Sequence, residues 1–220
     1  MAELHDATEE YLETILEIEE EGIPPIRARL VERLGLSAAA VSEQVNRLVD
    51  QGYAELLGDR TLALTDTGRA LAVSIVRRHR LAERLLVDVI GLEWEKAHKE
   101  ADRWEHAISA EVEEKLVELL GDPATCPHGN PIPGSKHRTD PVGVTALSAF
   151  APGPATVTRI SEKLELDDAA LAYVAGAALV PGDRVSVLRR EPGGVVVLES
   201  ARGEQRVPAD LADLLFVARD

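Results

Sequence analysis

The first amphipathic pattern in the chain lies in residues 6–22. Five apolar residues there are spaced three and four apart, and they form one stripe on a helix: Tyr11, Leu12, Ile15, Leu16 and Ile18. Asp6 and Glu9 have the spacing of a capping box, which predicts that the helix begins at Asp6. The segment is therefore expected to be a helix that buries one face.

Two shorter helices are predicted next, over 25–34 and 37–51. The first begins at a proline and ends before Gly35, and Ser37 is placed to cap the second. Two short helices joined by a turn that contains glycine are typical of a helix-turn-helix. This pattern predicts a DNA-binding unit.

A hairpin is predicted directly after these helices. Residues 53–57 and 61–65 carry the apolar residues of two short strands, and Arg60 lies at the tip between them. A helix-turn-helix followed by such a hairpin is a winged helix. Packed helices with a purely structural hairpin remain the alternative, because the same geometry occurs outside DNA-binding proteins.

Two long helices are predicted over 67–89 and 93–120, the second capped again at Ser109. The first carries the runs LAVSIV and LAERLLVDVI, more apolar surface than so small a unit can bury. Dimerisation would cover this surface, and a dimer also suits a protein that contacts two half-sites on DNA.

The chain loses its periodicity between Asp122 and Pro154, which predicts a linker. Strand-like segments over 155–160, 183–190, 194–200 and 204–208, with a helix over 167–179, predict a small β-barrel at the end. The expected fold is mainly α with small β parts. Its expected domains are a winged helix-turn-helix over 1–73, a helical dimerisation domain over 74–140, and a small β-barrel domain over 141–220.

Composition changes this picture little, but charge distribution matters. The 220 residues are 45% hydrophobic and 29% charged, and the single cysteine, Cys126, excludes an internal disulfide. No apolar run reaches the roughly 18 residues of a membrane-spanning helix, and the first residues are acidic, so a cytoplasmic protein is expected.

The net charge of -15 opposes DNA binding. Residues 1–21 hold nine of the acids and no Lys or Arg, whereas every basic residue in 22–75 is arginine.

Histidines and acids fall together on two predicted helix faces. His79 and Glu83 are four residues apart, and His98, Asp102, Glu105 and His106 share one face of the next helix. Burying two imidazoles and two carboxylates on one stripe is costly unless a cation lies among them, and a divalent metal is such a cation. A solvated, salt-bridged face is the alternative at this point.

Six segments carry a resemblance to a known family: ATEEYLETI, RARLVERL, LSAAAVSEQVNRL, RHRLAERLLVDVIGL, WEHAIS and HGNPIPG. They resemble the diphtheria toxin repressor family of iron- and manganese-dependent regulators over residues 1–140. The C-terminal part is similar to the family's SH3-like domain more loosely. The resemblance thus implies a helical metal-binding and dimerisation domain over 74–140 and an SH3-like domain over 141–220. The resemblance implies a repressor that binds operator DNA as a dimer when loaded with Mn(II) or Fe(II), with two metal sites per chain.

The resemblance also implies which residues bind metal. The primary site would use Glu10, Asp102, Glu105 and His106. The second site would use His79, Glu83 and His98 with acids from the C-terminal domain, for which Glu162 and Glu165 match best. Cys126 and His128 are competing ligands for the second site, because some manganese-type members have a similar Cys-Pro-His.

Two departures from the iron-type pattern favour manganese. Iron-responsive members carry methionine where Glu10 stands and cysteine where Asp102 stands, whereas manganese-responsive members carry acids there. Carboxylates make the site rich in hard oxygen ligands, which suits Mn(II) and also Fe(II). An iron-dependent regulator of iron uptake remains the alternative.

For DNA contact, the expected residues are Arg27, Ser37, Ser42, Arg47 and Arg60, most of them touching phosphates. Iron-type members carry proline, threonine and glutamine where Ala39, Ala40 and Glu43 stand, so a changed operator is implied. Glu43 could accept a hydrogen bond from a cytosine amino group, although an exposed helix glutamate needs no such role.

Two other classes of protein are alternatives. Glu95 and His98 form a Glu-x-x-His motif like those of di-metal carboxylate enzymes, but that architecture needs a second such motif and the sequence has none. A winged-helix regulator that senses something other than metal is the other class. No membrane and no small organic substrate are expected as partners.

Overall fold

The computed structural model describes residues 2–137 and 143–219, and the chain divides into two compact units, Met1–Arg78 and His79–Asp220. The division falls inside a continuous helix, α4 (Asp66–Arg84), which contributes to both. The predicted domain boundary after residue 73 stays a prediction, and the one after residue 140 lies outside the described residues.

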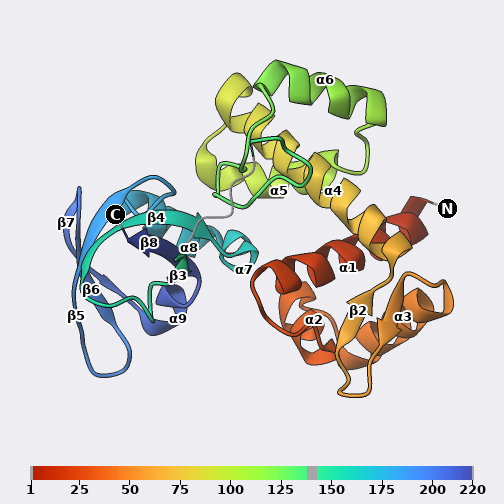
Figure 1. Ribbon diagram of the computed structural model, residues 1–220, viewed down its shortest axis with the longest axis horizontal. Helices are drawn as coiled ribbons and strands as arrows, with labels where there is room; N and C mark the ends of the chain where they lie inside the picture. The colour runs from red at the N-terminus through yellow and green to blue at the C-terminus, as the bar shows by residue number, and fades with distance from the viewer. Residues whose placement is uncertain (1, 138–142, 220) are drawn as a thin grey trace. The chain divides into compact units, whose positions relative to one another are not determined.

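The first unit is a winged helix-turn-helix, as predicted. It contains α1 (Ala2–Glu20), α2 (Arg27–Leu34), α3 (Ala38–Asp50) and the antiparallel pair β1 (Ala54–Leu56) and β2 (Leu62–Leu64) (Figure 1). Gly35 ends α2 with a φ of 64°, and the Ser37 hydroxyl accepts a hydrogen bond from the Ala40 amide at the start of α3. Local capping signals therefore set these boundaries.

The core of the first unit forms where α1 packs on the other elements. The predicted apolar stripe of α1 is fully buried together with Leu30 of α2, Val45 and Leu48 of α3, and Leu62 of β2. One expectation was wrong: α1 begins at Ala2, so Asp6 lies inside the helix instead of capping it. The segment before Asp6 carries no helix-breaking residue, and the helix simply continues through it.

The helices of the second unit are more broken than predicted. After α4 the chain forms a π-helical turn, Leu85–Ile90, that ends at Gly91. A short 3-10 helix (Trp94–Lys96) leads into α5 (Ala97–Trp104), and α6 (Ala110–Leu120) follows with Ser109 as its cap. The single helix predicted over 93–120 is thus interrupted between Trp104 and Ala110, whereas the predicted cap at Ser109 is confirmed.

The segment 122–137 corrects the predicted linker, because it is packed against the rest of the second unit. His128, Asn130 and Ile132 are all buried, and Thr125 pairs with Pro131 in a β-bridge. The loss of periodicity and the many glycines and prolines predicted a linker, but several side chains of this loop are buried within the unit.

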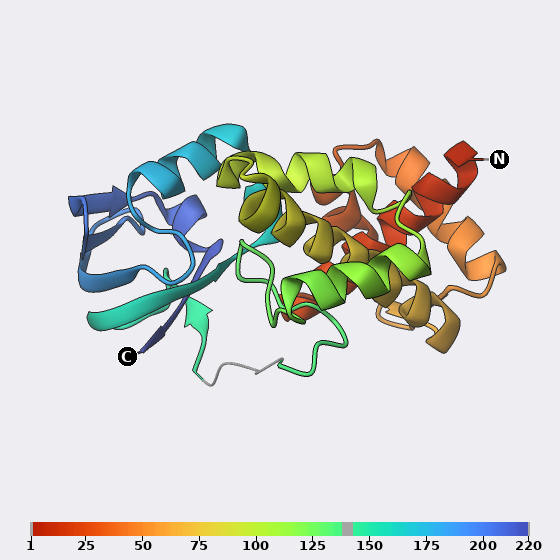
Figure 2. The same cartoon turned by 90° about the horizontal axis from the view of Figure 1, so that it is seen from above.

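The end of the chain forms a six-stranded antiparallel sheet. Its order is β3-β8-β4-β5-β6-β7, with β3 (Thr145–Ala146), β4 (Gly153–Ile160), β5 (Arg184–Arg190), β6 (Val196–Ser200), β7 (Gly203–Val207) and β8 (Leu215–Arg219). Three short helices accompany it: α7 (Glu162–Glu165), α8 (Asp168–Gly176) and α9 (Ala209–Ala212). In both views α8 lies at one end of the sheet (Figures 1 and 2). The predicted β domain is confirmed, although α7, α9, β3 and β8 were not predicted.

Candidate metal centre

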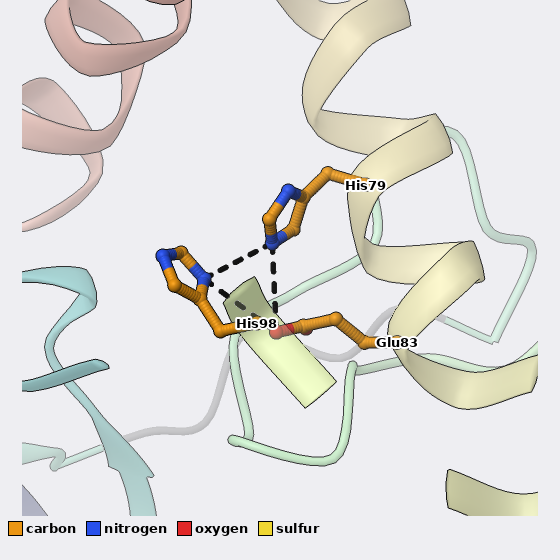
Figure 3. Close-up of side chains that lie close together, drawn as sticks. All are labelled: His79, Glu83 and His98. Atoms are coloured by element: carbon orange, nitrogen blue, oxygen red, sulfur yellow. Dashed lines mark hydrogen bonds and ion pairs between the residues drawn. The ribbon is translucent and has the colours of Figure 1, made fainter. Parts of the chain in front are cut away.

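Three side chains of the second unit point toward one another at the start of its helical part. His79 and Glu83 come from successive turns of α4, and His98 comes from α5 (Figure 3). His79 Nε2 lies 3.1 Å from His98 Nδ1 and 3.5 Å from Glu83 Oε1, and His98 Nδ1 lies 3.7 Å from Glu83 Oε1. All three side chains are buried.

The opposite nitrogen of His79 is held by a carboxylate. His79 Nδ1 lies 2.5 Å from Glu105 Oε2, so a proton on Nδ1 is donated to Glu105, and Nε2, which faces the other two side chains, is the nitrogen left to bind a metal ion. A carboxylate that orients the far nitrogen of a histidine in this way is typical of metal-ligating histidines.

A second group of potential ligands meets Glu83 from another direction. His128 Nδ1 lies 2.8 Å from Glu83 Oε1 and 2.9 Å from Glu165 Oε2. Cys126 is buried beside them, and ligand atoms of Glu83, Cys126 and His128 all lie within 4.8 Å of one another. The sequence predicted two alternative sets of ligands for the second site, the acids of the C-terminal part and the Cys-Pro-His. In the structure the two sets are adjacent.

The structure brings Asp102, Glu105 and His106 together only in part, because among the described residues their ligand atoms do not form a group within 4.8 Å of one another. Asp102 Oδ1 lies 3.5 Å from His79 Nδ1, and Glu105 Oε1 lies 3.3 Å from His106 Nε2. Glu105 is buried, whereas half of the Asp102 side-chain surface is exposed. Glu10 lies on α1 in the first unit and is exposed.

Two residues that sequence reasoning missed hold the acids in place. Arg80 is 1% exposed, and its guanidinium donates to Glu162 Oε1 at 2.9 Å and to the Pro131 carbonyl at 2.6 Å. The Asn130 amide donates to Glu165 Oε1 at 2.9 Å. Arg80 directly follows His79 in the sequence, but nothing there indicates that its side chain turns inward. Because Arg80 engages Glu162, Glu165 is the acid that faces the histidines more closely.

The electrostatics of the cluster follow from its burial. Burial opposes a charge on His79, His98 and His128, but the surrounding carboxylates outweigh it and raise the pKa of each ring well above its ordinary value. Burial likewise opposes ionisation of Glu83 and Glu165, but His128 and its neighbours lower the pKa of both. Burial, reinforced by Glu165, raises the pKa of Glu162, and burial raises that of Asp102.

The cluster has the properties of a cation site. Glu83, Glu105, Glu162 and Glu165 are buried carboxylates, and Arg80 is the buried guanidinium among them, so the remaining charge must be balanced by protons on the histidines or by a metal ion. Ligand atoms around an ion with bonds of about 2.1 Å are separated by roughly 3 to 3.5 Å. The three distances between His79, Glu83 and His98 are 3.1, 3.5 and 3.7 Å, close to this range. Glu83 Oε2 is buried and has no hydrogen-bond partner among the described residues. The residues present therefore fit a divalent ion.

The residues expected at DNA lie on or beside α2, α3 and the wing. Ser37, Ala39, Ala40, Glu43 and Arg60 are exposed, and Arg27, Ser42 and Arg47 are partly exposed. Two of them already have partners, because Arg27 donates to Asn46 Oδ1 at 2.9 Å and Arg47 to Glu43 Oε1 at 3.0 Å. Arg60 occupies the wing tip with a φ of 69°.

Nowhere in the described ranges does a helix combine the length and the apolar character needed to cross a membrane.

Comparison with known proteins identifies two family models along the chain. Residues 3–62 match the iron dependent repressor N-terminal DNA binding domain, and residues 65–134 match the iron dependent repressor metal binding and dimerisation domain. Together the two models cover more than half of the chain.

Whole relatives agree with these models. The iron-dependent repressor IdeR of Mycobacterium bovis is 42% identical over 229 aligned positions, which cover 100% of each chain, and the diphtheria toxin repressor of Corynebacterium diphtheriae is 51% identical over 153, covering 70% of this chain and 66% of that one. A solved manganese-dependent transcriptional repressor in complex with manganese is 33% identical with a TM-score of 0.83, covering 97% of this chain and 100% of that chain.

The family consists of regulators, which decides against the di-metal enzyme and against a winged-helix protein that senses something other than metal. The chain belongs to the iron-dependent repressor family, and it is a metal-dependent transcriptional repressor with an N-terminal DNA-binding domain.

Proposed function

We propose that this repressor binds operator DNA as a dimer when it is loaded with Mn(II), and that it controls genes of metal homeostasis. Fe(II) is the second candidate effector. The observation that carries the proposal is the buried cluster around Glu83, where imidazole nitrogens and carboxylates meet. Only protons on the rings or a bound cation can balance the negative charge of these carboxylates.

Each chain is proposed to have two sites. The primary site consists of Asp102, Glu105 and His106, of which Glu105 contacts His106 and Asp102 lies near His79, and of Glu10, whose inclusion rests on the sequence. The second site contains five proposed ligands: His79, Glu83, His98, Glu165 and Glu162. Arg80 competes for Glu162, so Glu165 is the more available of the two acids.

A bound divalent ion supplies the positive charge that ring protons supply in its absence. The chain's own residues then set the consequences. Glu105 divides its two oxygens between His79 and His106, so it connects the two proposed sites. Glu10 belongs to a helix of the DNA-binding unit, and binding of metal and of operator would therefore strengthen each other reciprocally.

The metal preference is proposed from the ligand chemistry. Glu10 and Asp102 contribute hard oxygen atoms, which Mn(II) and Fe(II) accept and thiophilic metals do not favour. Manganese is the effector in the name of one similar solved structure. The full-length similarity to a protein named an iron-dependent repressor is the observation that keeps Fe(II) as the second candidate.

The proposed DNA contacts are made by α3 and its cap, the start of α2 and the wing. Arg27, Arg47 and Arg60 would bind phosphates, and Ser37 and Ser42 would add hydroxyl contacts. Ala39, Ala40 and Glu43 would face the bases, with Glu43 in part engaged by Arg47.

Dimerisation is proposed through the region after α4. Val89 and Ile90 of the π-helical turn are both more than half exposed. Ile90 also lies at the apolar side of a groove, formed with Leu86, Leu92 and Trp104, whose other lining residues are charged. Apolar surface of this kind marks a protein interface.

Metal-dependent DNA binding provides the test. DNA is selected from a random pool in Mn(II), and its binding is then measured by fluorescence anisotropy in chelator, in Mn(II) and in anaerobic Fe(II). Tight binding in Mn(II), with loss in chelator, is expected. In Glu105→Gln this metal dependence should be lost, whereas the exposed His137→Ala serves as a control that keeps it.

The choice between the two metals needs a second variant. The double variant Glu10→Met/Asp102→Cys is expected to shift the response from Mn(II) toward Fe(II), because it replaces oxygen ligands by sulfur. Binding that is equally tight in chelator and in either metal would overturn the proposal. A double variant that still responds to Mn(II) like the unchanged protein would remove Glu10 and Asp102 from the site.

A further inference from the structure

We infer that Gln44 is a positioning residue that couples the proposed metal site to the DNA-contacting face of α3. It acts through its hydrogen bond with Thr8, which lies on the same helix as Glu10. The inference rests on the proposed function, because it assumes that Glu10 binds the effector metal. It goes further in naming the contact through which α1 acts on α3.

Gln44 is a polar residue on the buried face of α3. Its companions on that face are apolar and fully buried: Val41, Val45 and Leu48. Gln44 itself is 8% exposed, and a buried amide is costly unless it is hydrogen-bonded. Packing alone would favour an apolar residue at this position, so the hydrogen-bond partner of the amide decides where the side chain lies.

The partner of the amide is a hydroxyl on α1. Gln44 Nε2 donates to Thr8 Oγ1 at 3.3 Å, although the two residues are 36 positions apart in the sequence, and both side chains are buried. The distance is longer than the usual value of about 2.9 Å. A small displacement of α1 therefore strengthens or breaks this bond, whereas the apolar contacts around it are not directional and change little.

The two ends of the bond lie beside residues with proposed roles. Thr8 and Glu10 are two positions apart on α1, so they lie within one helical turn and move together. Gln44 directly follows Glu43 and lies three positions before Arg47, both of which are expected at DNA. A force on the Glu10 carboxylate therefore has a direct path to the DNA-contacting face of α3.

The cost of breaking the bond gives the link its direction. Without Thr8 the amide of Gln44 would be buried and unsatisfied, so the two helices favour arrangements that keep the bond. A metal ion that holds Glu10 in one position would thereby also favour one position of α3. Binding of metal and binding of DNA then share this bond as part of their coupling.

The test measures a metal-dependence factor, which is the affinity for the selected operator DNA in metal divided by the affinity in chelator. Fluorescence anisotropy gives this factor for the unchanged full-length protein and for Gln44→Leu, Thr8→Val and the double variant, in Mn(II) and in anaerobic Fe(II). Each single substitution should lower the factor about three- to tenfold, the effect of one hydrogen bond. The double variant should lower it no further, because both substitutions remove the same bond.

Two further variants control for packing. Thr8→Ser keeps the hydroxyl and should keep the factor. Thr14→Val removes the hydroxyl of another buried threonine of α1, which donates to the Glu10 carbonyl of its own helix at 2.7 Å, and should also keep the factor. Gln44→Met replaces Gln44→Leu if circular dichroism shows that the latter is unfolded.

A purely structural role of Gln44 predicts a different pattern. Equal losses of DNA affinity in metal and in chelator would leave the factor unchanged and would overturn the inference. It would also be overturned by additive effects in the double variant, or by a lowered factor in Thr8→Ser or Thr14→Val. If the unchanged protein shows no metal dependence, the proposed function fails as well, so the two failures are distinguishable.

Discussion

Cys126 lies fully buried beside His128 in the loop 122–137. Burial, together with the charge of Glu83, raises the pKa of its thiol to about 12. Since the thiolate is the reactive form, the free thiol should be almost inert in the metal-free protein at pH 8.

We expect iodoacetamide to alkylate Cys126 at least roughly a hundredfold more slowly in the chelator-treated folded protein than in denaturant. Mass spectrometry at timed intervals measures both rates on the same residue, so the unfolded chain is its own control. Equal rates in the two states would show that the thiol is exposed or already ionised.

The buried ion pair of Arg80 with Glu162 leads to a prediction about stability. Replacing it with methionine leaves Glu162 buried without its cation, which should lower the free energy of unfolding by about 3–5 kcal/mol. Urea unfolding followed by circular dichroism measures the change.

The exposed Arg103, paired with Glu100 on α5, provides the matched control, and Arg103→Met should cost less than about 1 kcal/mol. The double variant Arg80→Met/Glu162→Gln should recover part of the loss. If Arg80→Met unfolds at the same urea concentration as the unchanged protein, the buried ion pair does not stabilise the second unit.

At the scale of elements, the loop 122–137 is fixed to the sheet by a close backbone approach. A Cβ atom on Gly129 would lie 2.1 Å from the Thr158 carbonyl oxygen of β4, and the φ of Gly129 is +88°. Both the space and the backbone conformation therefore require glycine here.

Gly129→Ala is expected to lower the free energy of unfolding by at least about 1–3 kcal/mol, because the loop must move away from β4. Thermal unfolding checks this. Gly176→Ala, in α8 with open space around it, is the matched control and should leave the melting temperature unchanged or slightly higher. The same melting temperature for both variants would contradict the tight packing of the loop.

Elements with local signals could be predicted from the sequence, and elements decided by distant contacts could not. Gly35, Ser37 and Ser109 end or cap helices by their own chemistry, so the corresponding boundaries were predicted well. The packing of the loop around Gly129 depends on β4, about thirty residues later, and nothing in its own composition indicates it.

The same distinction holds for the candidate site. His79 and Glu83 share a helix face, and their spacing predicted that they lie together. His128 contacts Glu83 although the two are 45 residues apart in the sequence, and Glu165 contacts Asn130 across 35 residues. Only the fold brings these residues together. Resemblance to relatives suggested these residues as alternatives, and the structure places them side by side.

At the scale of the whole molecule, pH and metal act on the same buried charges. The raised pKa values of His79, His98 and His128 mean that their contribution to stability is present below about pH 6.5 and is lost as the pH rises through the folded-state values. Glu83 and Glu165 act in the opposite sense, since their lowered pKa values give stability that is lost on acidification below about 4.5.

The metal-free protein should therefore melt at a lower temperature as the pH rises from 6.5 to 8.5. The increase in melting temperature caused by Mn(II) should grow over the same range, because fewer ring protons compete with the ion. Differential scanning calorimetry in chelator and in Mn(II) measures both. A melting temperature in chelator that rises with pH, or a metal effect that shrinks, would contradict this charge balance.

The contact between Trp94 and His128 has an optical consequence. The indole and imidazole rings lie 4.6 Å apart, and the indole Nε1 donates to the Pro127 carbonyl at 2.9 Å, so the fluorophore is fixed beside this potential ligand. Protonated imidazole and paramagnetic ions both quench indole emission. The chain has two tryptophans, and replacing Trp104 with phenylalanine would leave Trp94 as an unlabelled intrinsic reporter of metal occupancy.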